Sequence, residues 1–218
     1  MPTSEVFNMD CMEGMAKYPD KYFELAIVDP PYGNDNIKGG YTSGKGGGVA
    51  KQKNYNKSLW QFSEPDSIYF DEIYRISKNQ IIWGANHYPY RFKKSSGWIF
   101  WDKLNGDVSF SDGELAYTSF NVGLRKFAFR WSGMLQQNMK NKEIRIHPTQ
   151  KPVALYKWLL TYYAKQGDKI LDTHLGSGSS RIAAYDMGFD FTGFELDKDY
   201  FEAQEKRFND FKAQLKLF

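Results

Sequence analysis

The chain has 218 residues, with 29 Lys and Arg against 26 Asp and Glu and a hydrophobic content of 41%. This length is enough for one sizeable α/β core. The single cysteine, Cys11, excludes an internal disulfide, and the histidines at 87, 147 and 174 lack metal-ligand spacing, so we expect no metal. The first residues resemble no signal peptide and no apolar stretch approaches membrane length, which predicts a cytoplasmic protein without membrane contact.

Predicted helices alternate with most of the predicted strands, and this order favours a mostly parallel sheet. Strands are expected at residues 6–9, 24–28, 80–84, 98–101, 114–119, 126–130, 169–172 and 190–194. Helices are expected at residues 11–18, 66–77, 152–165, 178–187 and 198–212. Residues 98–130 show no helical pattern and are predicted to form an antiparallel part of the sheet. Because no repeat or linker divides the chain, residues 1–218 are predicted to form a single domain.

The motif Asp29-Pro30-Pro31-Tyr32 follows an apolar run at residues 25–28. Each proline lacks an N–H group and has a fixed φ, and Pro30 also restricts Asp29, so the chain leaves the strand as a stiff, extended hook with free carbonyl groups. Acceptors that bind the N–H groups of an aromatic amine favour its nucleophilic pyramidal form, and preorganised polar groups of this kind are usually the largest catalytic contribution. Tyr32 can stack on a base, worth roughly 1–3 kcal/mol. The alternative is a proline-rich turn without chemistry.

A second motif near the other end predicts a turn between a strand and a helix. Gly176 and Gly178 allow positive φ and a close backbone approach, and the helix that opens at Ser179 offers free N–H groups. Asp172 at the end of the strand suits a ligand with a positive ammonium group. Glu195 ends the next strand roughly twenty residues after the glycines, where an acid can bind ribose hydroxyls, as in dinucleotide folds.

The two motifs together resemble those of the DNA amino-methyltransferases, and their order, catalytic box first and cofactor box last, resembles the permuted β class. The resemblance covers most of the chain and implies an α/β, Rossmann-like fold with a mostly parallel mixed sheet and one antiparallel strand. It implies S-adenosylmethionine (SAM) as the cofactor and the exocyclic N6 amine of a flipped-out adenine in double-stranded DNA as the substrate. This chain departs from the family's usual Asp-Pro-Phe in the cofactor box, because Thr173 and His174 follow Asp172.

The resemblance also implies roles for individual residues. Asp29 and the Pro30 carbonyl would hold the amine, with Pro31 and Tyr32 completing the catalytic box. The box at residues 147–152 would lie near the methionine end of SAM, where Lys151 could pair with its carboxylate. The expected cofactor-binding residues are Asp10, Cys11, Asp29, Thr149, Lys151, Asp172, His174, Gly176, Gly178, Ser179 and Glu195. Asp10 would bind the adenine amine of SAM, and a helix N-cap is the alternative for it.

Basic residues gather in two stretches, of net charge +4 at residues 34–57 and +5 at residues 125–145, so the rest of the chain carries −6. Such segregation is the expected footprint of a polyanion, and two solvated loops are the alternative. Residues 33–58 are predicted to form a mobile loop beside the catalytic box, and residues 103–146 are the family's place for target recognition. The candidate DNA-binding residues are Lys45, Lys51, Lys53, Lys57, Arg125, Lys126, Arg130, Lys140, Lys142 and Arg145.

Several alternatives remain open at this point. The family tendency is Asp at the first position of the catalytic box for adenine and Ser for cytosine, so Asp29 favours adenine over N4 methylation of cytosine. Methylation of RNA and a non-catalytic nucleic-acid-binding relative are further alternatives, as is a homodimer rather than a monomer. Asn86 or His87 could touch the substrate, although a structural role is favoured. A restriction partner, an orphan regulator and a phage-borne enzyme would share this sequence pattern.

Overall fold

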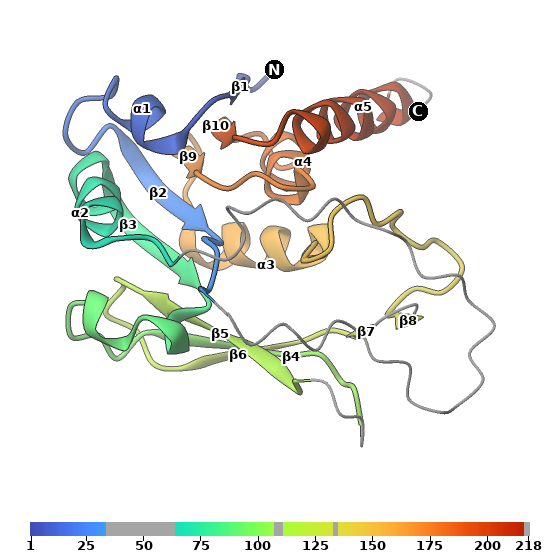
Figure 1. The fold of residues 1–218 in the computed structure, drawn as a ribbon. Coiled ribbons are helices and arrows are strands. Elements are labelled where there is room, and N and C mark those ends of the chain that lie inside the picture. The colour runs from blue at the N-terminus through green and yellow to red at the C-terminus, as the bar shows by residue number, and fades with distance from the viewer. Residues whose placement is uncertain (34–63, 107–110, 133–134, 216–218) are drawn as a thin grey trace.

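The computed structural model describes residues 1–33, 64–106, 111–132 and 135–215. Within them, eight strands form one sheet in the order β1-β10-β9-β2-β3-β5-β4-β6, and β7 and β8 form a separate hairpin (Figure 1). The strands are β1 (Ser4–Asn8), β2 (Phe23–Val28), β3 (Ser77–Trp83), β4 (Trp98–Asp102), β5 (Gly113–Thr118), β6 (Arg125–Ala128), β7 (Trp131–Ser132), β8 (Leu135–Gln136), β9 (Lys169–Asp172) and β10 (Asp190–Glu195). Lys45, Lys51, Lys53, Lys57 and the predicted mobile loop after Gly33 lie outside the described residues.

The eight-stranded sheet is mostly parallel, as predicted, and among its described strands only β5 runs against its neighbours. The expected antiparallel patch at residues 98–130 is correct for β5 but wrong for β6, which pairs in parallel with β4. The reason is the strand order. Strand β4 lies between β5 and β6. After β5 the chain therefore passes one end of β4 to reach its other side, and β6 then runs in the same direction as β4.

Helices cover both faces of the sheet. They are α1 (Cys11–Met15), α2 (Ser67–Ile76), α3 (Val153–Tyr163), α4 (Ser179–Asp186) and α5 (Lys198–Leu215), with short 3₁₀ helices η2 (Ala85–His87) and η3 (Pro89–Arg91) after β3. Alternate residues of β2 belong to different cores: Leu25 and Ile27 pack with α3 and α4, whereas Ala26 and Val28 pack with α2. Burial on both faces explains why this strand is a continuous apolar run.

The connections bring the motifs to one edge. Strands β1, β10, β9, β2 and β3 are mutually parallel neighbours, so their carboxyl ends lie at the same edge of the sheet. In open α/β sheets this edge is where ligands bind. Strands β2 and β9 pair directly, with Leu25 opposite Ile170, and this pairing places the two sequence motifs side by side although they are far apart in the chain. In the described part of the chain no helix is long and apolar enough to cross a membrane.

Candidate active site

The Asp29 carboxylate is held by two side chains. Its Oδ1 accepts a hydrogen bond of 2.6 Å from the Tyr32 hydroxyl, and its Oδ2 forms an ion pair with the ammonium of Lys151. Burial raises the pKa of Asp29, and the Lys151 ammonium opposes this rise. The Tyr88 hydroxyl donates to the carbonyl oxygen of Pro30 at 3.2 Å and also contacts that of Pro31. The catalytic motif is therefore fixed by contacts from outside it as well as by its two prolines.

The ring of Tyr32 lies flat against His87. The ring centroids are 4.8 Å apart and the planes differ by 10°. His87 belongs to η2, which begins after Gly84, a residue with φ of +67°. The structure therefore gives His87 the supporting role that the sequence favoured, because it backs one face of the Tyr32 ring.

A chain of alternating charges leads away from Asp29. Lys151 lies between Asp29 and Glu114, with its Nζ 2.9 Å from Glu114 Oε2, and Glu114 Oε1 is 2.7 Å from the ammonium of Lys103. Burial opposes the ionisation of Glu114, but the two ammonium groups lower its pKa to about 2. Burial likewise opposes protonation of Lys151, yet the two carboxylates raise its pKa. Two positive and two negative charges balance, so the cluster can remain charged in the interior.

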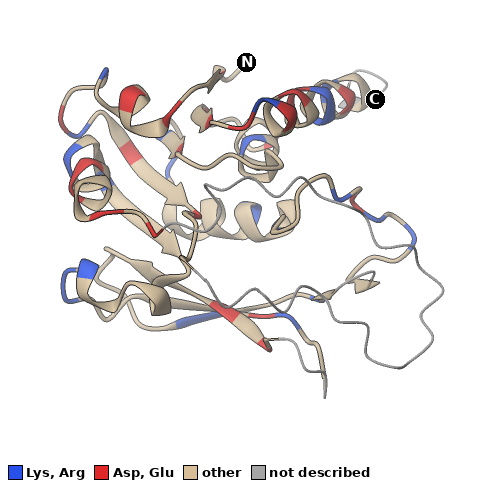
Figure 2. Cartoon of the chain, viewed as in Figure 1, with Lys and Arg blue, Asp and Glu red and all other residues tan. Residues whose placement is uncertain are grey.

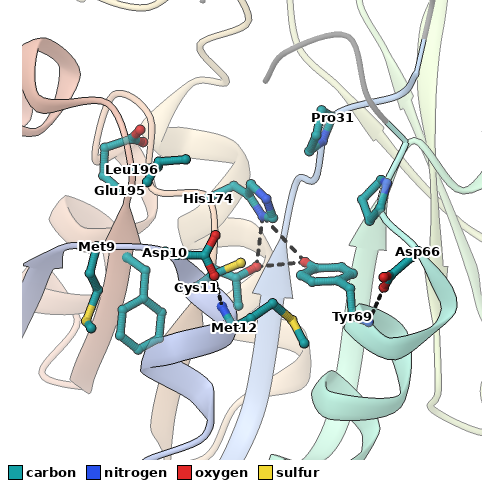
Figure 3. A pocket seen from close by; sticks show the side chains of 13 residues that line it. Met9, Asp10, Cys11, Met12, Pro31, Asp66, Tyr69, His174, Glu195 and Leu196 are labelled. Carbon is teal, nitrogen blue, oxygen red and sulfur yellow. Dashed lines mark hydrogen bonds between the residues drawn. The ribbon is translucent and has the colours of Figure 1, made fainter. Parts of the chain in front are cut away.

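A pocket of about 250 Å³ opens beside the catalytic motif at the ends of β1, β9 and β10. The Asp10 carboxylate, the His174 ring and Pro31 converge on it from three different segments (Figure 3). Met12, Phe194 and other apolar groups provide flat or flexible walls. The lining residues are Met9, Asp10, Cys11, Met12, Pro31, Pro65, Asp66, Tyr69, Thr173, His174, Phe194, Glu195 and Leu196.

Three acids line this pocket, and two of them, Asp10 and Glu195, are expected cofactor residues. Asp10 is the N-cap of α1, where its Oδ1 accepts from the N–H of Met12 at 2.8 Å. The N-cap alternative is therefore correct, and it is compatible with a place in the pocket wall. Glu195 accepts from the N–H of Gly176 at 2.7 Å and from that of Asp197 at 2.9 Å. Burial raises the pKa of Glu195 to about 7.

His174 extends into the pocket with its Nδ1 turned toward protein hydroxyls (Figure 3). The Thr173 hydroxyl lies 3.0 Å from His174 Nδ1, and the Tyr69 hydroxyl lies 2.7 Å from Thr173 Oγ1. If the hydroxyls donate in this order, Nδ1 is the acceptor and Nε2 carries the proton. Burial lowers the pKa of His174 to about 4, so the ring is neutral at physiological pH.

The glycine turn is stabilised from within the protein. The Asp172 carboxylate accepts from the N–H of His174 at 3.0 Å and from the Ser180 hydroxyl at 2.5 Å. Gly178 precedes α4 with φ of +70°, and a Cβ on it would lie 3.1 Å from Gln204 Oε1. The turn has the expected backbone, and the loop itself supplies one hydrogen bond to each oxygen of the Asp172 carboxylate.

Some expected cofactor residues are not in the pocket wall. Asp10, Cys11, His174 and Glu195 line it, whereas Asp29, Thr149, Lys151, Asp172, Gly176, Gly178 and Ser179 do not. Lys151 differs most from its expected pairing with a cofactor carboxylate, because both of its ion-pair partners belong to the protein. A buried ammonium needs such partners, and β5 supplies the second of them, which no local pattern around Lys151 could predict.

Sequence reasoning missed several residues of the site. Tyr69 and Asp66 come from the start of α2, Tyr88 from the segment after β3, and Glu114 from β5. Tyr69 reads as one apolar position in a helical stripe, so nothing distinguishes it from a core residue before the fold is known.

The described basic residues differ in their surroundings. Arg125, Arg130, Lys140 and Lys142 are exposed. Lys126 pairs with Asp102 at 2.8 Å, and the guanidinium of Arg145 lies over the Trp131 ring at 4.4 Å. The segment between β8 and α3 carries basic positions with Glu143 among them (Figure 2). Glu143 pairs with Arg207 of α5 at 2.7 Å, which ties this basic segment to the cofactor side of the domain.

The fold is similar to those of solved DNA methyltransferases. The chain aligns with a crystal structure of the M1.HpyAVI–SAM complex with a TM-score of 0.58 and 18% identity, over 93% of this chain and 98% of that one. It aligns with the cytosine-N4-specific PvuII DNA methyltransferase with a TM-score of 0.59 and 11% identity, over 98% and 93%. Together with the pocket at the carboxyl edge of the sheet, this likeness defines the class as an α/β methyltransferase fold.

Sequence comparison narrows this class to a family. The model of the family described as DNA methylase, N6_N4_Mtase, matches residues 49–206, and the chain belongs to this family of DNA amino-methyltransferases. Type II methyltransferase M2.LlaDCHI of Lactococcus lactis subsp. cremoris is 26% identical over 154 residues, or 71% of this chain and 50% of that protein. The chain thus spans about half the length of curated relatives that it matches. The family expected from the two motifs is confirmed.

Proposed function

We propose that this protein transfers a methyl group from SAM to the exocyclic N6 amine of adenine in DNA, as a single methyltransferase domain. The observation that carries the proposal is the position of Asp29-Pro30-Pro31-Tyr32 beside the pocket, into whose wall Pro31 extends. A substrate amine held by Asp29 and a cofactor held in the pocket would thus meet at the edge of the sheet. The family match and the likeness to type II methyltransferases support this assignment.

The pocket residues fit the adenosine part of SAM. Asp10 offers an acceptor for an amine, Glu195 offers carboxylate oxygens for ribose hydroxyls, and Met12 and Phe194 offer apolar surface for a purine ring. The backbone N–H that Glu195 binds at Gly176 links this acid to the glycine turn. When bound, SAM supplies an electrophilic methyl group on a sulfonium. The solved M1.HpyAVI structure of similar fold is a SAM complex, which supports the choice of cofactor.

The catalytic motif keeps acceptor capacity for a substrate amine. A carboxylate has about four lone-pair positions and a carbonyl has two. The two contacts of Asp29 and the Tyr88 contact of Pro30 therefore leave room for N–H donors on both groups. By accepting both amine hydrogens they would favour the pyramidal nitrogen. The face of Tyr32 opposite His87 would stack on the base, which leaves the duplex at a cost of a few kcal/mol.

Cytosine N4 is the second candidate target, because its amine is chemically equivalent and the PvuII enzyme of similar fold is cytosine-N4-specific. Adenine is favoured by Asp at position 29, since Asp at this place of the motif is the family's tendency for adenine. Double-stranded DNA is the proposed partner, with the exposed Arg125, Arg130, Lys140 and Lys142 as candidate phosphate contacts. A homodimer is compatible with this function but is not required by it.

The test is incubation of the purified protein with methyl-labelled SAM and double-stranded DNA of mixed sequence, followed by nucleoside analysis. Label in N6-methyladenine supports the proposal, and label in N4-methylcytosine replaces the target base. Asp29→Asn is the matched variant, because it keeps the shape of the side chain but loses its charge. It should bind SAM and transfer methyl groups at least about 10²-fold more slowly. No label in any nucleoside of DNA would refute the proposed function.

A further inference from the structure

The ammonium of Lys151 is enclosed by the protein at the point where the catalytic motif meets β5. Its side chain is 2% exposed, and it contacts the carboxylates of Asp29 and Glu114. It also lies 3.3 Å from the Tyr32 hydroxyl. The ammonium donates hydrogen bonds to Asp29 and to the Tyr32 hydroxyl, and its contact with Glu114 is an ion pair. The protein itself therefore supplies the oxygen partners of the Lys151 ammonium.

Glu114 is anchored independently of Lys151. Its other oxygen pairs with Lys103 at 2.7 Å, and Lys103 comes from the segment that follows β4. Strand β5 pairs with β3 at residues 116–118 and with β4 at residues 113–117, where Glu114 lies opposite Trp101, so the sheet holds the Glu114 backbone. The position of Lys151 is therefore set by a rigid strand rather than by the cofactor pocket, whose wall it does not join.

From this geometry we propose that Lys151 is a positioning residue for Asp29: held by Glu114, its ammonium orients the Asp29 carboxylate and keeps it charged, ready to accept an amine N–H. The inference rests on the proposed function, because it assumes that Asp29 receives the substrate amine. It gives Lys151 a place in the base-binding half of the site, where the sequence had placed it beside the cofactor carboxylate. Glu114 acts one step further away, through Lys151.

The charges around Asp29 explain why a cation is needed there. Burial and the nearby Glu114 both raise the pKa of Asp29, and the charge of Asp29 in turn raises the pKa of Asp172. Lys151 is the charged neighbour that lowers the pKa of Asp29. The groups that face Asp29 in the described structure are Lys151, Glu114, Tyr32, Tyr88, Tyr156 and Asp172. Without Lys151, burial and the charge of Glu114 would favour the neutral form of the carboxyl, opposed by the hydrogen bond from Tyr32.

The test compares Lys151→Met, Lys151→Arg and the double variant Lys151→Met/Glu114→Gln with wild type. Single-turnover methyl transfer is measured from pH 5 to pH 9. Lys151→Met should be about 10²-fold slower at neutral pH, with the acid limb of its rate profile moved up by about one pH unit or more. In the double variant the acid limb should move back toward its wild-type pH, because the charge of Glu114, which raises the pKa of Asp29, is gone. Lys151→Arg should keep the wild-type limb, because the charge remains.

Two further measurements do not depend on turnover. Calorimetry should show SAM affinity unchanged in Lys151→Met, and ¹³C NMR of labelled aspartate should show Asp29 titrating at higher pH in that variant, with Asp29→Asn assigning the signal. Lys157→Met is the control, since Lys157 is an exposed lysine of α3 that pairs with Asp186 and should leave all readouts unchanged. If Lys151→Met is partly unfolded, the NMR titration of Lys151→Arg still tests the inference. In that variant Asp29 must titrate as in the wild type.

The possible failures are distinguishable. An unmoved acid limb and Asp29 titration, together with weaker SAM binding in Lys151→Met, would overturn the inference and return Lys151 to the cofactor carboxylate. A wild-type protein that methylates neither adenine nor cytosine would refute the proposed function instead. In that case the NMR titration still measures whether Lys151 controls the charge of Asp29.

Discussion

Gly84 lies directly against the ring of Tyr32: a Cβ atom added to Gly84 would be 2.0 Å from Tyr32 Cε1. A second constraint comes from His87, whose ring stacks on that of Tyr32 with a centroid distance of 4.8 Å. The segment that follows β3 therefore forms a closely fitted support for Tyr32. A side chain at position 84 would have to move the ring that we expect to stack on the target base.

Gly84→Ala should consequently reduce methyl transfer by about 10²-fold, because displacement of Tyr32 misplaces the base. SAM affinity should stay at the wild-type value, since neither residue lines the pocket. Gly106→Ala is a matched control: Gly106 has the same φ of +67°, but a Cβ there meets nothing within 4 Å. Single-turnover kinetics and calorimetry would check this, and equal losses in the two variants would attribute the effect to backbone strain alone.

SAM binding should strengthen as pH rises through 7. Burial raises the pKa of Glu195 to about 7, and the ionised carboxylate is the better acceptor for ribose hydroxyls. If only this form binds, affinity should rise about tenfold between pH 6 and pH 8. His174, with a pKa of about 4, stays neutral throughout this range.

Calorimetric titration of wild type and Glu195→Gln over this range would measure the effect of Glu195. The comparison of the two proteins also cancels the effect of the α-amino group of SAM, which titrates in a similar pH range. A wild-type affinity that varies no more with pH than that of Glu195→Gln would remove Glu195 from ribose binding.

Cys11 should react slowly with thiol reagents. Burial, followed by the charge of Asp10, raises the pKa of the thiol to about 12. At pH 8 the thiolate fraction is then about 10⁻⁴, so alkylation should be about 10³-fold slower than in the urea-unfolded chain. Saturating SAM should slow it further, because Cys11 lines the pocket. Mass spectrometry of iodoacetamide-treated protein would follow the reaction, and rapid labelling of the folded protein would contradict the expected burial.

DNA affinity should depend on the exposed basic residues near β6 and β8. Replacing Arg130, Lys140 and Lys142 by Gln should reduce the slope of log affinity against log salt by about three, close to one for each phosphate that the protein no longer neutralises. The control variant replaces Lys198 and Lys206 of α5 by Gln, and it should keep the wild-type slope. Each of these lysines pairs with an acid four residues further along the helix. Fluorescence anisotropy of labelled DNA in about 50–300 mM salt would measure the slopes of the wild type and of the two variants. Equal slopes for these three proteins would exclude the proposed DNA-binding surface.

The fold could be predicted from the sequence because its strands have strong local patterns. The run at residues 25–28, the glycine turn after β9 and the helices between strands each specify their own structure. The mostly parallel sheet follows from their order. The direction of β6 did not follow, because it depends on which side of β4 the chain returns to.

The candidate site could be predicted only in part, for the same physical reason. Asp29 and Glu195 were found because each ends a strand, and strand ends are positions that the sequence reveals. The partners of Lys151 and the support of Tyr32 by His87 depend on contacts between distant segments. The sequence around Lys151, next to Pro152 and α3, does not indicate which carboxylates the ammonium pairs with. That depends on the order of the strands.

The pairing of β2 with β9 has a consequence for synthesis of the protein on the ribosome. Strand β2 can pair with β3 as soon as residue 83 has been made, but its other edge stays unpaired until β9, at residues 169–172, emerges. At about 5–20 residues per second, this interval lasts several seconds. During that time an apolar strand presents an open edge, the type of surface that recruits other chains. Nascent-chain protection over this interval should therefore determine how much of the protein escapes aggregation.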